Sequence, residues 1–167
     1  MPNHVTNRIT STDPGVLQKL RNALKGEGDT VDFNRVIPTP DDIFQGDLTA
    51  DKQRETKGRN WYDWNTQNWG TKWNAYQCSM GGDAIVFQTA WSCPEPVIRK
   101  LAEIVAGPWI WEYADEDIGS NLGTFHVSDR KTIPLSCPTE ENDRIAFACR
   151  VTETDEEGYR AMLEEGF

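Results

Sequence analysis

The sequence lacks the features that mark several familiar protein classes. Its 167 residues include only two histidines and four cysteines, and no apolar run approaches the roughly 18 residues of a membrane span. The cysteines are 15, 44 and 12 positions apart, with neither a C-x-x-C pair nor a histidine at zinc spacing. We therefore expect reduced thiols, no metal and no cofactor. Because the polar start also lacks the pattern of a signal peptide, we expect a soluble, cytoplasmic protein.

Positive charge is scarce as well, with 17 Lys and Arg against 27 Asp and Glu, for a net charge of −10. Residues 1–111 hold 12 basic and 13 acidic side chains, whereas residues 112–167 hold 5 basic and 14 acidic ones. The excess disfavours non-specific attraction to nucleic acid or anionic lipid. Two interpretations of the acidic C-terminal third stay open: a solubilising surface, or an electronegative face that meets a basic partner.

Apolar periodicity predicts an α+β fold. Strands are expected at residues 3–10, 31–37, 84–91 and 109–113, with helices at residues 14–25 and 94–106. With a long insertion before the third strand, this is the βαββαβ order of a ferredoxin-like sheet with two helices on one face. A strand at 124–127, an apolar run at 145–151 that could extend the sheet, and an acidic helix at 155–163 follow.

These elements divide the chain into two parts. We expect a ferredoxin-like domain at residues 1–127, with its insertion at 38–80, and an acidic extension at 128–167 that packs on the same domain. A homodimer formed through an exposed sheet edge stays open.

Tryptophan is concentrated in one segment. Four of the chain's seven tryptophans lie between residues 60 and 74. Trp61 and Trp64 are three positions apart and are expected to pack as core on one helical turn. For Trp69 to Trp73, core packing and an exposed binding surface are both open. The candidate binding residues of this segment are Trp69, Gly70, Thr71, Lys72 and Trp73.

A further tryptophan, Trp91, follows the third expected strand and precedes a helix. The pattern predicts that its side chain is buried. On that expectation, Trp91→Ala should cost roughly 3–5 kcal/mol of stability.

Four stretches carry a family resemblance: MPNHVTNRIT at 1–10, NWYDWNTQNWGTKWNAY at 60–76, FQTAWSCPEPVIRKLAEI at 87–104 and YADEDIGSNLGTF at 113–125. They resemble the YubB-type, Api-like ferredoxin-like domain family of bacteriophages and plasmids. The family more usually has proline after TAWS, where this chain has Cys93. The resemblance implies the ferredoxin-like fold and a mobile-element origin. It implies no catalytic residues.

Three functions from different classes remain open. The first is a protein-binding accessory protein of a phage or plasmid that inhibits a host defence system, by an anti-CRISPR or anti-restriction action. Its partner would be a host protein or ribonucleoprotein with a basic surface, engaged through Glu112, Asp115, Glu116 and Asp117. The second is a single-stranded nucleic-acid binder that uses the tryptophan segment and the basic side chains of residues 52–59. The third is a small enzyme that uses Asp115, Asp117 or His126.

Overall fold

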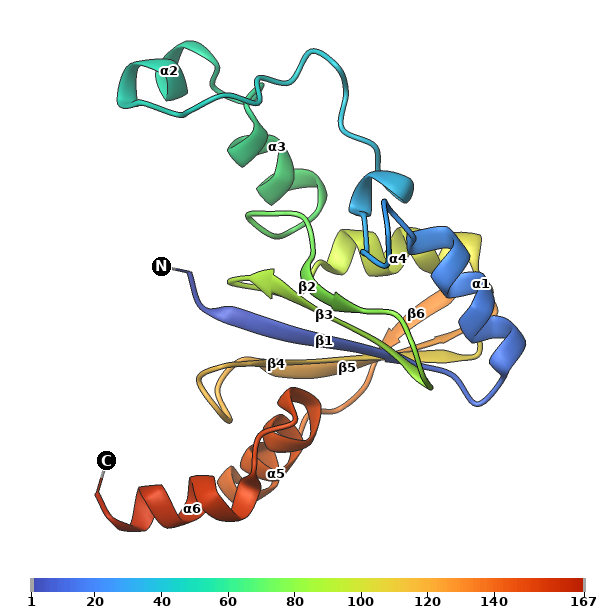
Figure 1. The fold of residues 1–167 in the computed structure, drawn as a ribbon, viewed down its shortest axis with the longest axis vertical. Helices are drawn as coiled ribbons and strands as arrows, with labels where there is room; N and C mark the ends of the chain where they lie inside the picture. The colour runs from blue at the N-terminus through green and yellow to red at the C-terminus, as the bar shows by residue number, and fades with distance from the viewer. Residues whose placement is uncertain (1, 167) are drawn as a thin grey trace.

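Six antiparallel strands form one sheet at the centre of the computed structural model, which describes residues 2–166 (Figure 1). The strands are β1 (His4–Thr10), β2 (Tyr76–Ser79), β3 (Ala84–Ala90), β4 (Trp109–Asp115), β5 (Leu122–Ser128) and β6 (Lys131–Pro134). Their order across the sheet is β2-β3-β1-β4-β5-β6. The first four strands have the ferredoxin-like order, so the predicted fold class is confirmed, and β5 and β6 widen the sheet beyond β4.

Helices lie on both faces of this sheet (Figure 1). They are α1 (Pro14–Leu24), η1 (Phe33–Arg35), α2 (Ala50–Glu55), α3 (Trp61–Asn68), α4 (Glu95–Ile104), α5 (Glu141–Thr152) and α6 (Glu156–Glu164). Helices α1 and α4 cover one face and enclose the main core, as the strand–helix order predicts. Helix α5 packs against β4 and β1 on the opposite face. Between residues 2 and 166, no helix is both long and apolar enough to cross a bilayer.

The main core depends on strict alternation along β1. Val5, Asn7 and Ile9 are fully buried beneath α1 and α4, whereas the side chains between them face the other side of the sheet. Asn7 is a polar group in this core, and its hydrogen bonds explain its place there. Its amide donates to Thr89 Oγ1 at 2.9 Å, and its carbonyl accepts from the indole N–H of Trp111 at 3.0 Å. The core is thus tied together across three strands.

Two expectations about secondary structure are wrong. Residues 31–37 do not form a strand: Val31 makes an isolated bridge, and the chain then turns through η1 because the Asp32 side chain caps it by accepting from Asn34 N. The edge strand is instead β2, which comes after the insertion. Residues 145–151 do not extend the sheet either. They lie in α5, where Ile145, Ala148 and Cys149 have helical spacing and are buried.

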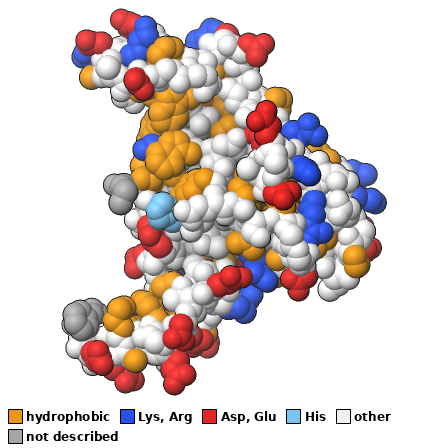
Figure 2. Space-filling view, viewed as in Figure 1, with side chains coloured by type: hydrophobic (Ala, Val, Ile, Leu, Met, Phe, Trp, Pro, Cys, Tyr) orange, Lys and Arg blue, Asp and Glu red, His pale blue; other side chains and the backbone are white. Residues whose placement is uncertain are grey.

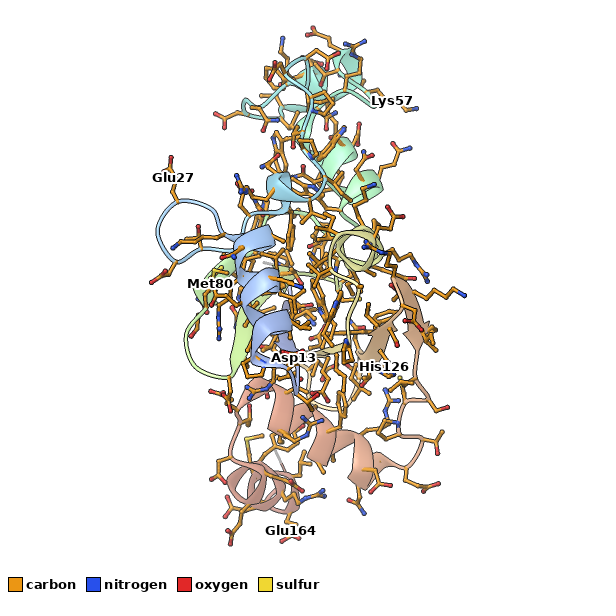
Figure 3. All side chains as sticks on the ribbon, turned by 90° about the vertical axis from the view of Figure 1, so that its right-hand side faces the viewer. Asp13, Glu27, Lys57, Met80, His126 and Glu164 are labelled. Carbon is orange, nitrogen blue, oxygen red and sulfur yellow. The ribbon has the colours of Figure 1, made fainter. Side chains whose placement is uncertain are left out.

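The segment between α1 and β2 forms a lobe that projects from the sheet (Figure 1). Its helix α3 begins at Trp61, and the buried side chain of the preceding Asn60 accepts from Asp63 N at 2.9 Å and so caps the first turn. The molecule is elongated as a result: Lys57 in this lobe and Glu164 in α6 lie at opposite ends (Figure 3). The N-terminus of β1 lies on the concave side between the two ends (Figure 1).

Candidate functional site

The tryptophan segment divides between core and surface. Trp64 and Trp69 are buried and meet edge to face, with ring centroids 5.2 Å apart. Trp69 also packs against Phe33, and its indole N–H donates to the carbonyl of Ile37 at 2.9 Å. Trp69, a candidate binding residue, is therefore a core residue. Trp64 is buried as predicted, and Trp61 is only half-buried.

A turn at Gly70 and Thr71 brings the following residues to the surface. Gly70 has a φ of +76°, and a Cβ there would lie 2.9 Å from Pro96 Cδ, so both the conformation and the close approach favour glycine. Thr71 is buried, and its hydroxyl donates to the carbonyl of Ala90 at 2.8 Å. These two candidates have a structural role, because they fix where Lys72 and Trp73 emerge.

The Lys72 side chain lies between two exposed indole rings. Its Nζ is 4.6 Å from the ring centroid of Trp73 and 4.8 Å from that of Trp91. Both distances fall within the range of cation–π attraction. Trp73 is 39% exposed and Trp91 43% exposed. The lysine therefore bridges two large rings at the surface.

Other aromatic side chains continue this surface on either side. The ring of Tyr62 is 6.2 Å from that of Trp91, and the ring of Trp61 is 5.9 Å from that of Tyr62. On the other side, Tyr76 lies 6.2 Å from Trp73. We call this set the aromatic platform: Trp61, Tyr62, Lys72, Trp73, Tyr76 and Trp91. Apolar side chains gather just below the projecting lobe, on the concave side of the molecule (Figure 2).

The prediction that Trp91 is buried is wrong, and its backbone explains why. Phe87 and Thr89 are both buried, so continued alternation along the strand would place the side chain of Trp91 in the core. Trp91 instead has a φ of +73°, a left-handed conformation that is costly for a bulky residue. Its N–H donates to the carbonyl of Asn3 at 2.9 Å, and its carbonyl accepts from the side chain of Asn121 at 3.2 Å. These bonds hold the ring outward.

Asp115 positions the two asparagines that bond the backbone of Trp91. The residue is only 5% exposed, and its carboxylate accepts from the side-chain amides of Asn3 at 3.1 Å and Asn121 at 3.4 Å. These are the two asparagines that bond the backbone of Trp91. Asp115, predicted as a contact residue, is thus placed to position the platform.

Glu116 and Asp117 are exposed, and Glu116 adjoins the platform through His4. The Glu116 carboxylate accepts from the backbone N–H of His4 at 2.8 Å, and the His4 ring lies 2.6 Å from the Tyr76 hydroxyl through Nδ1. Burial, and then the negative charge of Glu116, raise the pKa of Tyr76. Two predicted regions far apart in sequence therefore meet: the tryptophan turn and the acidic loop after β4.

Glu112 lies elsewhere. It points to the face of the sheet that α5 covers, where its carboxylate forms an ion pair with Arg150. This hydrogen bond to Glu112 raises the pKa of Arg150. The structure thus separates Glu112 from Lys72, Trp73 and Glu116.

The structure separates His126 from the two carboxylates considered for catalysis, whereas Asp115 and Asp117 stay together: Asp117 N donates to Asp115 Oδ1 at 2.9 Å. His126 is paired with Ile110 across β4 and β5. Asp115 is five residues further along β4, or roughly 17 Å at the usual rise of a strand. His4 lies at the Asp115 end of the sheet, paired with Ala90, so the two histidines do not meet.

The basic side chains of residues 52–59 are largely neutralised within the lobe. Lys52 pairs with Glu55 at 3.2 Å, Arg54 pairs with Asp51, and Arg59 pairs with Asp42. A continuous basic groove leading to the platform, which a single-stranded nucleic acid would need, does not arise from these side chains.

Comparison with known families decides the membership of the chain. A family model described as a ferredoxin-like domain in Api92-like protein matches residues 69–160. The chain belongs to this family. The Api-like resemblance expected from the sequence is confirmed, and the matched segment of this Api92-like chain begins at Trp69 and continues through α5. No curated protein and no solved structure matches the chain.

The sequence pattern did not predict that three platform residues face outward, namely Tyr62, Tyr76 and Trp91. It also did not place His4 beside them. Each stands in a segment that carries the family resemblance, but only Trp91 drew attention, as a core residue. The available signal was the aromatic content of these segments. It did not show which rings face outward, because a single left-handed residue changes the side to which the chain turns.

Proposed function

We propose that this Api92-like chain is a non-enzymatic protein-binding accessory protein, which docks a partner on the aromatic platform. The observation that carries the proposal is the pair of exposed indoles, Trp73 and Trp91, clamped by Lys72. Exposed tryptophans that are already held rigid lose little conformational freedom on binding. Large aromatic side chains of this kind dominate the binding energy at the centres of protein interfaces.

The backbone at Trp91 supports the same proposal. A left-handed conformation in a bulky residue costs free energy in the isolated protein. Here it is maintained by two hydrogen bonds: the Trp91 N–H donates to the Asn3 carbonyl, and the Asn121 side chain donates to the Trp91 carbonyl, with both asparagines bonded to Asp115. The outcome of this arrangement is an exposed ring, which gives the fold no core packing.

Charge favours a partner with a basic surface. Glu116 borders the platform, the exposed Asp117 follows it, and residues 112–167 hold 14 acidic and only 5 basic side chains. Acidic side chains at the rim would steer a basic partner toward the rings and raise its association rate. The resemblance to phage and plasmid proteins supports a partner within a host defence system, either CRISPR or restriction.

Paired variants test the docking surface. A Trp73→Ser/Trp91→Ser double variant removes both clamped rings, whereas Ile133→Ser removes an equally exposed apolar side chain, 49% exposed, on the distant strand β6. We expect the wild type and Ile133→Ser to form a stoichiometric complex with a purified defence complex and to restore phage plating. The double variant should lose both properties.

Two results would overturn this proposal. One is unchanged plating and no complex with any defence system carried by the host. The other is a double variant that binds as well as the wild type. An oligonucleotide titration followed by tryptophan fluorescence addresses the nucleic-acid alternative: quenching at physiological salt that disappears in the double variant would replace a protein partner with a nucleic acid.

A further inference from the structure

A second concave site lies on the sheet face opposite α1 and α4, next to the aromatic platform. It is a pocket of about 360 Å³ between the exposed parts of β1 and β3 and the segment that joins α5 to α6. Its polar walls include His4, Thr6, Gln88, Glu116, Thr154 and Tyr159. The volume lies within the range of small-ligand pockets.

Gln88, a residue of the pocket wall, carries an unmatched hydrogen-bond acceptor just beneath the pocket surface. Its side-chain oxygen Oε1 is buried and has no donor, which is true of no other buried side-chain nitrogen or oxygen in residues 2–166. Gln88 lies opposite Thr6 on β1 and Tyr76 on β2, so its place in the sheet is fixed by both neighbours. Since burying an acceptor without a partner is costly, a ligand that supplies an N–H group would satisfy it.

Glu116 gives the pocket a negative charge. One of its carboxylate oxygens, Oε1, accepts from His4 N at 2.8 Å. It is the only carboxylate among the lining residues, and the neighbouring Arg8 is paired with Glu153 at 3.3 Å. The pocket thus combines a carboxylate, a buried carbonyl oxygen and hydroxyl groups.

We propose that this pocket binds a guanidinium group. A guanidinium carries five N–H donors in one rigid plane, so it can bond a carboxylate and a carbonyl oxygen together, and its flat face stacks on aromatic rings. Tyr159 and His4 supply such rings at the pocket wall. An ammonium group matches the charge but neither the planar donor arrangement nor the stacking.

The source of the guanidinium is an arginine of the protein partner, and this part of the inference rests on the proposed function. Pocket and platform are continuous, because His4 contacts Tyr76 and Tyr76 contacts Trp73, with ring centroids 5.6 and 6.2 Å apart. A basic partner docked on the platform would therefore reach the pocket with a neighbouring arginine.

The pocket is tested without any partner. Ethylguanidinium chloride is titrated into the full chain and followed by NMR of backbone and side-chain amides, with ethylammonium chloride at the same ionic strength as the control. We expect saturable shifts at the Gln88 side-chain amide and at Thr6 and Glu116 with ethylguanidinium alone. Equal shifts with both salts, or none, would overturn the proposal.

Three variants sharpen the test. Glu116→Gln keeps an oxygen for His4 N but removes the charge, and Gln88→Leu removes the unmatched acceptor. Each should weaken ethylguanidinium binding by about ten-fold, the loss expected for one hydrogen bond to a charged group. Glu103→Gln, an exposed acid on α4 at the opposite face of the sheet, should bind normally. Gln88→Leu should also keep or raise Tm, which distinguishes a ligand-binding role from a structural one. Unchanged binding in both pocket variants would contradict the assignment.

The purified partner then separates the two proposals. Trp73→Ser/Trp91→Ser should lose the partner yet still bind ethylguanidinium, whereas Gln88→Leu should weaken both. If Gln88→Leu loses ethylguanidinium but holds the partner as tightly as the wild type, the arginine source is wrong and the pocket takes a free guanidinium compound.

Discussion

Trp109 and Trp111 lie fully within the core beneath α4, whereas Trp73 and Trp91 stand at the surface with Lys72 between their rings. The buried pair have partners for their indole N–H groups: Trp109 donates to the carbonyl of Val105 at 2.9 Å, and Trp111 donates to Asn7. The exposed pair are held by a cation and by the backbone instead. One residue type therefore packs the core in one region and forms an exposed surface in the other, where we propose that it serves recognition.

Truncation of a buried tryptophan should cause the largest loss of stability. Trp111→Ala should lower the free energy of unfolding by about 3–5 kcal/mol, because it empties a site that is 0% exposed and leaves the Asn7 carbonyl without its donor. Urea denaturation measures this loss. A loss below about 1 kcal/mol would show that the core tolerates the missing ring and would contradict the assignment.

Asn7→Ala should cause the next largest loss of stability. Asn7→Ala should cost about 2 kcal/mol, because the buried indole N–H of Trp111 loses its acceptor. Thr6→Ala, on the same strand but facing away from this core, serves as the control. The same Asn7 change in a Trp111→Phe background should cost clearly less, since phenylalanine has no N–H to satisfy. Equal costs in the two backgrounds would mean that the bond contributes nothing.

These core contacts lie where sequence periodicity is strongest, and there the fold could be predicted. Strict alternation in β1 and the helical spacing in α1 and α4 follow directly from the burial of one face. Periodicity did not predict β2. This strand has four residues, Gln77 has a φ of +48°, and its register with β3 shifts. So short and irregular a strand carries no readable alternation, and its place in the sheet depends on its pairing with β3.

The platform was only partly predictable for a related reason. Composition drew attention to Lys72 and Trp73, but the exposure of Trp91 depends on one backbone angle and on two asparagines from distant segments, Asn3 and Asn121. The contact between the acidic loop and the platform depends on the pairing of β1 with β4. Such long-range relations are absent from any local pattern.

Titration in the core should produce a smaller, gradual effect. Burial raises the pKa of the Cys93 thiol to about 12 and, together with the neighbouring Cys93, that of Tyr113 to about 12. The unfolded chain loses these protons first, so the free energy of unfolding is unaffected well below the ordinary thiol pKa and falls from about pH 8 as the pH rises toward 12. The slope from Cys93 alone should approach about 1.4 kcal/mol per pH unit. Cys93→Ala should flatten the profile, and an unchanged slope in that variant would assign the effect to other groups.

The exposed side of the comparison predicts the smallest effect on stability. Trp91→Ala should cost no more than about 1 kcal/mol, because much of the ring already lies in solvent. Trp91→Gly should be more stable than Trp91→Ala by about 1 kcal/mol, since glycine adopts the left-handed conformation without the steric cost that alanine keeps. Denaturation of the two variants beside Trp111→Ala measures both differences. If Trp91→Ala is as damaging as Trp111→Ala, the ring is part of the core and the distinction between the two groups of tryptophans fails. If alanine is the more stable variant, the backbone at Trp91 is not left-handed, and another contact must hold the ring outward.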